Sequence, residues 1–288
     1  MIAMIVTSVI AATVLSVTLS SRRLLRKDQQ RSQVNQDLRL GLDLLGVDIR
    51  QAGERLPADF PALEIVDGAS GAPDTLIIRR NLLDQVLPVC KKITKDTSTD
   101  QVRISKVTVP PDVPPKGCGP VADDDADGWP ENLEPWRDYR DGNGGVVKAY
   151  VFNPVKHWGE FFLFDGDGSN TQYIHKADTG NWLHTYRVNQ QCRVYIIQER
   201  RYELNGDVLE LVLDEDAGTT QRLLHGVTDF QIQAVMSDGS VTDALNVADE
   251  WGDLAALKVT LTAESEETGQ PMTREVSARF FPRNVLSL

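Results

Sequence analysis

Cysteine and histidine are scarce in this chain, and the signatures of common enzymes are missing. The 288 residues include three cysteines and four histidines, with no CxxC pair and no Cys/His spacing that zinc would need. The sequence holds no glycine-rich phosphate loop, no GxSxG and no HExxH. Carboxylates are plentiful, but no pair stands out as a general acid and base. These absences predict a non-enzymatic protein without a zinc site.

Charge is missing from the first 21 residues, although the chain has a net charge of -12 and a mean hydropathy of -0.28. A helix of that length spans about 31 Å, close to the ~30 Å hydrocarbon core of a bilayer. The stretch lacks a basic n-region and is longer than the apolar part of a secretory signal. We therefore expect residues 1–21 to form the transmembrane half of a helix. Its contacts with lipid or neighbouring helices are expected at Ile2, Ile5, Val6, Val9, Ile10, Val14 and Leu15.

Glycine and proline are absent from the first forty residues, so nothing interrupts a helix there. An amphipathic stripe follows, at Val34, Leu38, Leu42, Leu45 and Ile49. Gly41 and Gly46 weaken this half by about 1 kcal/mol each relative to alanine. Gly53 is a suitable C′ residue, and Pro57 prevents continuation. We expect one continuous helix of about 52 residues, with residues 22–56 as its amphipathic part.

After residue 57 the sequence pattern changes to short runs rich in β-branched and aromatic residues. Examples are "DTLIIRR", "VVKAYVF", "DVLELVL" and "LAALKVTLTAE", separated by turn clusters such as "DGAS" and "ELNGD". The alternation in several of these runs is typical of antiparallel strands. The expected fold is α+β: a long N-terminal helix packed on an antiparallel β-sheet head over residues 57–288, with a loop-rich middle insertion around 81–190.

The N-terminal part carries a net positive charge, whereas the rest of the chain is strongly acidic. Residues 1–52 carry seven Lys/Arg and four Asp, a net +3, so the remainder carries -15. A head this acidic repels phosphate backbones, which excludes nucleic acid as its partner.

Several segments carry a resemblance to a known family. These are "MIAMIVTSVIAATVLSVTLSSRR" and "LRLGLDLLGVDIRQAGERLP" in the helix, then "LLHGVTDFQIQAV", "DEWGDLAALKVTLTAES" and "VSARFFPRNVLSL" near the end. Together they resemble type IV pilin-like proteins, specifically the PilW-type minor pilins, with GspJ-type pseudopilins of type II secretion as near relatives. The resemblance covers about a third of the chain, and residues 81–190 match nothing in the family.

Two features depart from the family pattern. Prepilins carry a basic leader, a Gly before the cleavage point and a Glu soon after it, so the resemblance places Met1 inside the mature helix. The basic residues that follow the span would also place that end in the cytoplasm by the positive-inside tendency. They are Arg22, Arg23, Arg26 and Lys27. The resemblance implies a periplasmic head, and we follow the resemblance.

The segment "DDDADGWPENLE" matches the calcium-loop pattern. Alternate carboxylates on a tight turn converge on the hard oxygen sphere that Ca²⁺ prefers. The candidate ligands are Asp123, Asp125, Asp127, Trp129 through its carbonyl, Glu131 and Glu134. A solvated acidic turn is the alternative interpretation. Two shorter segments, "DGNGG" and "DGDGS", have only the first half of the pattern and are more typical of turns.

The three cysteines allow three pairings. If the body lies outside the cytoplasm, one disulfide and one odd thiol are expected. We favour Cys90–Cys118, because both residues lie in a Pro/Gly/Lys-rich region with little else to hold its shape. Cys192 lies in the apolar run "CRVYIIQ" and is expected to be a buried small hydrophobe.

The resemblance implies a structural subunit of a type IV pilus that primes filament assembly or lies at the tip. The implied partners are other minor pilins, the major pilin and a tip adhesin. The implied location is the inner membrane with the head in the periplasm, and the cell-surface pilus after assembly. One alternative is a GspJ-like pseudopilin, and another is a membrane-anchored calcium-dependent adhesin or hydrolase.

Overall fold

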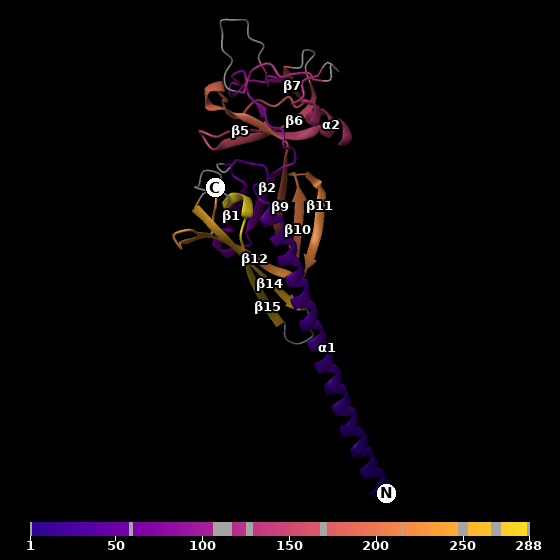
Figure 1. Cartoon of the computed structure of the whole chain (residues 1–288). Coiled ribbons are helices and arrows are strands. Elements are labelled where there is room, and N and C mark those ends of the chain that lie inside the picture. Colours follow the sequence, from indigo (N-terminus) through magenta and orange to yellow (C-terminus); the bar gives the residue numbers. More distant parts are fainter. Residues whose placement is uncertain are drawn as a thin grey trace.

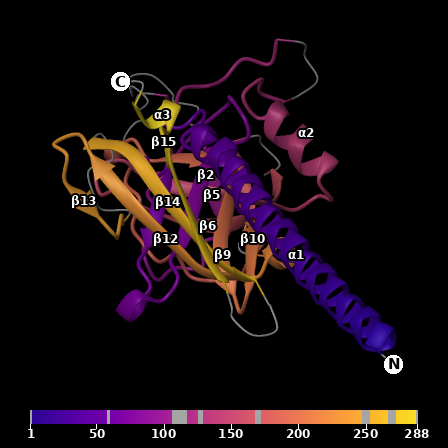
Figure 2. The same ribbon diagram turned by 90° about the horizontal axis from the view of Figure 1, so that it is seen from below.

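The computed structural model describes residues 2–57, 60–105, 117–124, 129–167, 172–214, 216–246, 253–265 and 272–286. One long helix, α1 (Ile2–Gln51), begins the chain and is followed by a body made mostly of antiparallel strands. The predicted α+β architecture is therefore confirmed. The helix projects from the body as a rod whose N-terminal half stands free in both views (Figures 1 and 2).

The end of α1 follows the glycine signal in the sequence. Gly53 adopts φ 76°, the left-handed conformation that glycine accepts at a helix C-terminus. Its amide donates to the Arg79 carbonyl at 3.0 Å, so the chain passes directly from the helix onto the body.

Two sheets and α1 make the first lobe. One sheet has the order β1-β2-β9-β10-β11, and the other has the order β13-β12-β14-β15. The strands of the first sheet are β1 (Leu63–Val66), β2 (Thr75–Asn81), β9 (Ile197–Asn205), β10 (Val208–Leu213) and β11 (Asp216–His225). Those of the second are β12 (Val227–Met236), β13 (Val241–Thr242), β14 (Leu254–Ser265) and β15 (Met272–Phe280), and α3 (Arg283–Leu286) follows.

A second lobe lies at the end of the body away from the N-terminus (Figure 1). Its six-stranded sheet has the order β3-β8-β5-β6-β7-β4 and is accompanied by α2 (Glu134–Gly142). Its strands are β3 (Leu87–Pro88), β4 (Gln101–Arg103), β5 (Val147–Asn153), β6 (Trp158–Asp167), β7 (Tyr173–Lys176) and β8 (Arg193–Tyr195). The middle segment that we expected to be loop-rich thus contains a folded sheet.

The topology explains how this middle segment is inserted. Asn81 pairs with Ile197 at the end of the β2–β9 ladder, so the chain leaves and re-enters the first lobe at one point. Each lobe has its own buried core, and Trp136, Phe164 and Trp182 lie in that of the second lobe. A small aromatic cluster around Phe60 joins the lobes, where its ring lies 4.7 Å from that of Phe152.

Candidate assembly surface on the long helix

The described side chains in the first part of α1, from Leu15 to Gln33, do not pack on the body. Between Leu15 and Gln33 every side chain that the structure describes is exposed, and Leu24 and Leu25 are 63% and 62% exposed. Contact with the body begins at Val34. The exposed leucines here lie among exposed charged residues such as Arg22, Arg26 and Asp28.

The inner stripe of α1 is the amphipathic face predicted from the sequence. Leu38, Leu42, Leu45 and Ile49 are at most 4% exposed. They belong to one core cluster with residues of β14, β15, β11 and β2, so the helix closes the open faces of both first-lobe sheets. Burial of four large aliphatic side chains fixes the rotation of the rod.

The two glycines in this part of the helix allow its close approach to the sheets. A Cβ at Gly41 would lie 2.2 Å from Cδ1 of Leu224, and one at Gly46 would lie 2.3 Å from Cε1 of Phe280. From the sequence alone, these two glycines are expected only to lower the stability of the helix, and their role in close packing is visible only in the structure.

A buried polar anchor complements the apolar stripe. Asp48 is 6% exposed, and its two carboxylate oxygens accept hydrogen bonds from the Arg200 guanidinium and the Tyr202 hydroxyl on β9. Burial and the neighbouring Asp48 carboxylate raise the pKa of Tyr202, so this phenol stays a donor at physiological pH. Gln51 accepts a further bond from Arg80 at 2.5 Å.

A second apolar stripe lies on the opposite side of the helix. Leu40, Leu44 and Val47 are 56%, 43% and 46% exposed, at spacings of four and three. This outer stripe was missed in the sequence, although its spacing is the same helical signal as that of the inner stripe. In this part of α1 one face therefore packs on the body and the opposite face exposes apolar side chains.

The predicted membrane contacts lie mostly outside the described side chains. The side chains of Ile2, Ile5, Val6, Val9, Ile10 and Val14 are not described, whereas Leu15 is 61% exposed. Among the residues that the structure describes, no helix combines the length and apolar character required to cross a membrane.

The predicted calcium loop is described only in part. Asp125 and Asp127 lie outside the described residues. Glu131 accepts a hydrogen bond from the Asp124 amide at 3.0 Å, and Glu134 begins α2. Trp129 packs under the Arg137 guanidinium, 3.8 Å from the ring centroid. In the described ranges no three His, Cys, Asp or Glu side chains are grouped to hold a metal ion, and the calcium site stays a prediction.

The acidic residues of "DGDGS" contact basic side chains. Asp165 lies 2.5 Å from Nδ1 of His175, and Asp167 pairs with Arg140 at 2.8 Å and Arg137 at 3.2 Å. Both carboxylates lie on β6 and contact side chains of β7 and α2, and the turn predicted at "DGDGS" falls partly outside the described residues.

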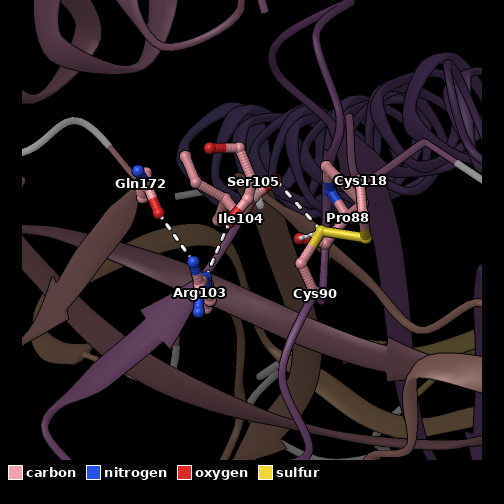
Figure 3. The surroundings of a disulfide bond; sticks show 7 residues. All are labelled: Pro88, Cys90, Arg103, Ile104, Ser105, Cys118 and Gln172. Carbon is pink, nitrogen blue, oxygen red and sulfur yellow. Dashed lines mark hydrogen bonds between the residues drawn. A yellow bond between two sulfur atoms is a disulfide. The ribbon is translucent and has the colours of Figure 1, made fainter. Parts of the chain in front are cut away.

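The predicted disulfide is confirmed. Cys90 and Cys118 are joined with their Cα atoms 5.5 Å apart, and both are buried (Figure 3). The Cys90 amide donates to the Arg103 carbonyl at 2.6 Å, and Arg103 reaches Gln172 at 2.7 Å. The disulfide therefore links the segment around Cys118 to the chain that follows β3 in the second lobe. Cys192 is the buried free thiol that the sequence predicted.

Comparison with family models, curated proteins and solved structures finds no match to this chain.

Proposed function

We propose that this chain is a non-enzymatic minor pilin of the PilW type. It would be held in the inner membrane by residues 1–21 with its two-lobed head in the periplasm. It would then enter a filament through α1, priming assembly or lying at the tip. Its partners would be the α1-like helices of other minor pilins and of the major pilin, and a tip adhesin at its exposed head.

One observation carries this proposal: a single helix is sealed against the body on one face and bare on the other. The helix from Ile2 to Gln33, whose described side chains are all exposed, is about 48 Å long. An isolated helix gains most of its stability from burying a face, so a projecting rod needs either lipid or other helices around it. An uncharged tip suits both environments, because association in lipid depends on close packing rather than on charge.

The decisive experiment compares two triple variants of the full chain in cells that depend on it. Leu40→Gln, Leu44→Gln and Val47→Gln remove the outer stripe of α1. The matched control replaces three apolar residues of the body that are at least as exposed on average, Val155→Gln, Leu183→Gln and Val241→Gln. Each of these surface substitutions should change the free energy of unfolding by no more than about 0.5 kcal/mol.

We expect the outer-stripe variant to remain membrane-bound and to lose surface filaments, while the control assembles normally. Loss of exoprotein secretion with normal pili would reassign the chain to a type II pseudopilin. Normal assembly of both variants would refute the proposal. A chain without residues 1–21 should in addition appear in the soluble fraction.

A further inference from the structure

Three clefts adjoin one another where the two lobes meet near the disulfide. Their volumes are about 430, 460 and 470 Å³. The first two share Val86, Gln191 and Arg193, and the first and third share Val188. They form one continuous surface, which we call the junction groove. Ligand sites of this size commonly lie at the boundary between two lobes.

The charge of the junction groove is opposite to that of the molecule. Arg55, Arg193, Lys92 and Arg187 line it, and no Asp or Glu is among the lining residues that the structure describes. This contrasts with a chain that has 42 acidic and 30 basic residues. Arg55 is partly neutralised by Asp84 at 2.7 Å. Arg193 is exposed and has no carboxylate partner among the described residues.

The geometry of β8 places Arg193 beside apolar residues that line the groove. Side chains alternate along β8, so Cys192 and Val194 point into the second core while Arg193 and Tyr195 share the other face. Tyr195 packs in the aromatic cluster at the lobe junction, with Leu56 and Val86 against it. A cation therefore stands next to a surface suited to aliphatic side chains.

These features select one class of partner. Polyphosphates and highly charged polysaccharides are repelled by the net negative charge of the chain. An extended peptide with one or two carboxylates brings little charge and supplies the apolar side chains as well. Carboxylates are also the group that an arginine fork binds best.

We propose that the junction groove binds an extended, acidic and apolar segment of a partner protein. A carboxylate of the segment pairs with Arg193, and its apolar side chains cover Leu56 and Val86. This site lies on the head, at the end of the molecule away from the projecting N-terminal half of α1, and does not depend on the proposed role of α1.

The test uses the full chain in non-ionic detergent and a fluorescein-labelled, end-blocked peptide of alternating leucine and glutamate. Fluorescence anisotropy should report binding, and the leucine–glutamine counterpart should bind about ten-fold more weakly. Arg193→Gln should weaken binding of the glutamate peptide by about the same factor. Gln191→Glu, which places a carboxylate in the groove, should do likewise. Arg279→Gln, at an exposed arginine of β15, is the matched control and should leave binding unchanged.

Three results would overturn the proposal. One is equal binding of the glutamate and glutamine peptides, or no binding of either. Another is an equal effect of Arg193→Gln and Arg279→Gln. The last is Arg193-dependent binding of polygalacturonate or duplex DNA that is tighter than that of the peptide.

Discussion

At the scale of single residues, Gly46 is one of two glycines at which α1 approaches the sheets too closely for a side chain. Alanine would favour the helix by about 1 kcal/mol. Its methyl group would, however, lie 2.3 Å from Cε1 of the buried Phe280 ring, which cannot move without displacing the core. Overpacking of this kind costs about 1 to 3 kcal/mol.

We therefore predict that Gly46→Ala lowers the free energy of unfolding by about 1 kcal/mol. Gly142→Ala in α2 is the control, because a Cβ there meets nothing within 4 Å. It should leave stability unchanged or raise it slightly. Urea denaturation followed by far-ultraviolet circular dichroism measures both. A stabilised Gly46→Ala variant would contradict the close approach.

Cys192 provides a prediction on pH. Burial raises the pKa of its thiol to about 11. The folded state thus holds this proton more tightly than the unfolded state, whose thiol has an ordinary pKa near 8.5. The resulting stabilisation is complete below the ordinary pKa and is lost as pH rises through 9 to about 11.

Iodoacetamide should therefore modify Cys192 very slowly in the folded protein at pH 8 and rapidly in urea. Between pH 8 and 11 the parent should lose more stability than Cys192→Ala. Mass spectrometry reports the modification, and urea titrations at each pH report the stability. Fast modification of the folded protein at pH 8 would show that the thiol is accessible.

At the scale of elements, the two faces of α1 have opposite roles although their residues alternate along one sequence. Leu45 is fully buried among the sheets, whereas its neighbour Leu44 is 43% exposed. Removal of buried methyl groups leaves a cavity, while removal of exposed ones does not.

Leu45→Ala should therefore lower the free energy of unfolding by about 3 kcal/mol. Leu44→Ala should change it by less than about 0.5 kcal/mol in the unassembled protein. The pair is matched in composition and position, so chemical denaturation of both isolates the effect of packing. Equal losses would mean that the rod is rotated from the orientation described.

At the scale of the whole molecule, two separate cores are joined by a small aromatic cluster. Lobes with their own cores can unfold independently when the interface between them is small. The disulfide lies wholly in the second lobe and closes a loop over a sequence separation of 28 residues. Such a crosslink stabilises a fold by about 3 kcal/mol.

Replacement of Cys90 and Cys118 by alanine should lower the stability of the second lobe by about 3 kcal/mol and spare the first. Hydrogen exchange should accelerate in β5 and β8 and stay unchanged in β12 and β14. Cys192→Ala is the control for the loss of a cysteine. Equal acceleration in all four strands would show that the lobes unfold as one unit.

The sequence by itself determined the elements with strong local signals. The absence of breakers defined the length of α1, Gly53 defined its end, and the stripe from Leu38 to Ile49 defined its buried face. Alternating runs indicated an antiparallel body, and the loop setting of Cys90 and Cys118 indicated their pairing. Each of these signals lies within one short segment, because helix periodicity, strand alternation and turn-forming residues determine the local conformation of the backbone.

Only the tertiary structure decided which segments meet. Asn81 pairs with Ile197 although the whole inserted lobe separates them in the sequence. Gly41 and Gly46 allow close contact with side chains far along the chain. Arg193 lies in the same cleft as Val86. These relations join residues with no common local pattern. The second lobe, the outer stripe of α1 as a free face and the junction groove follow from which surfaces are buried, and burial is a property of the assembled fold.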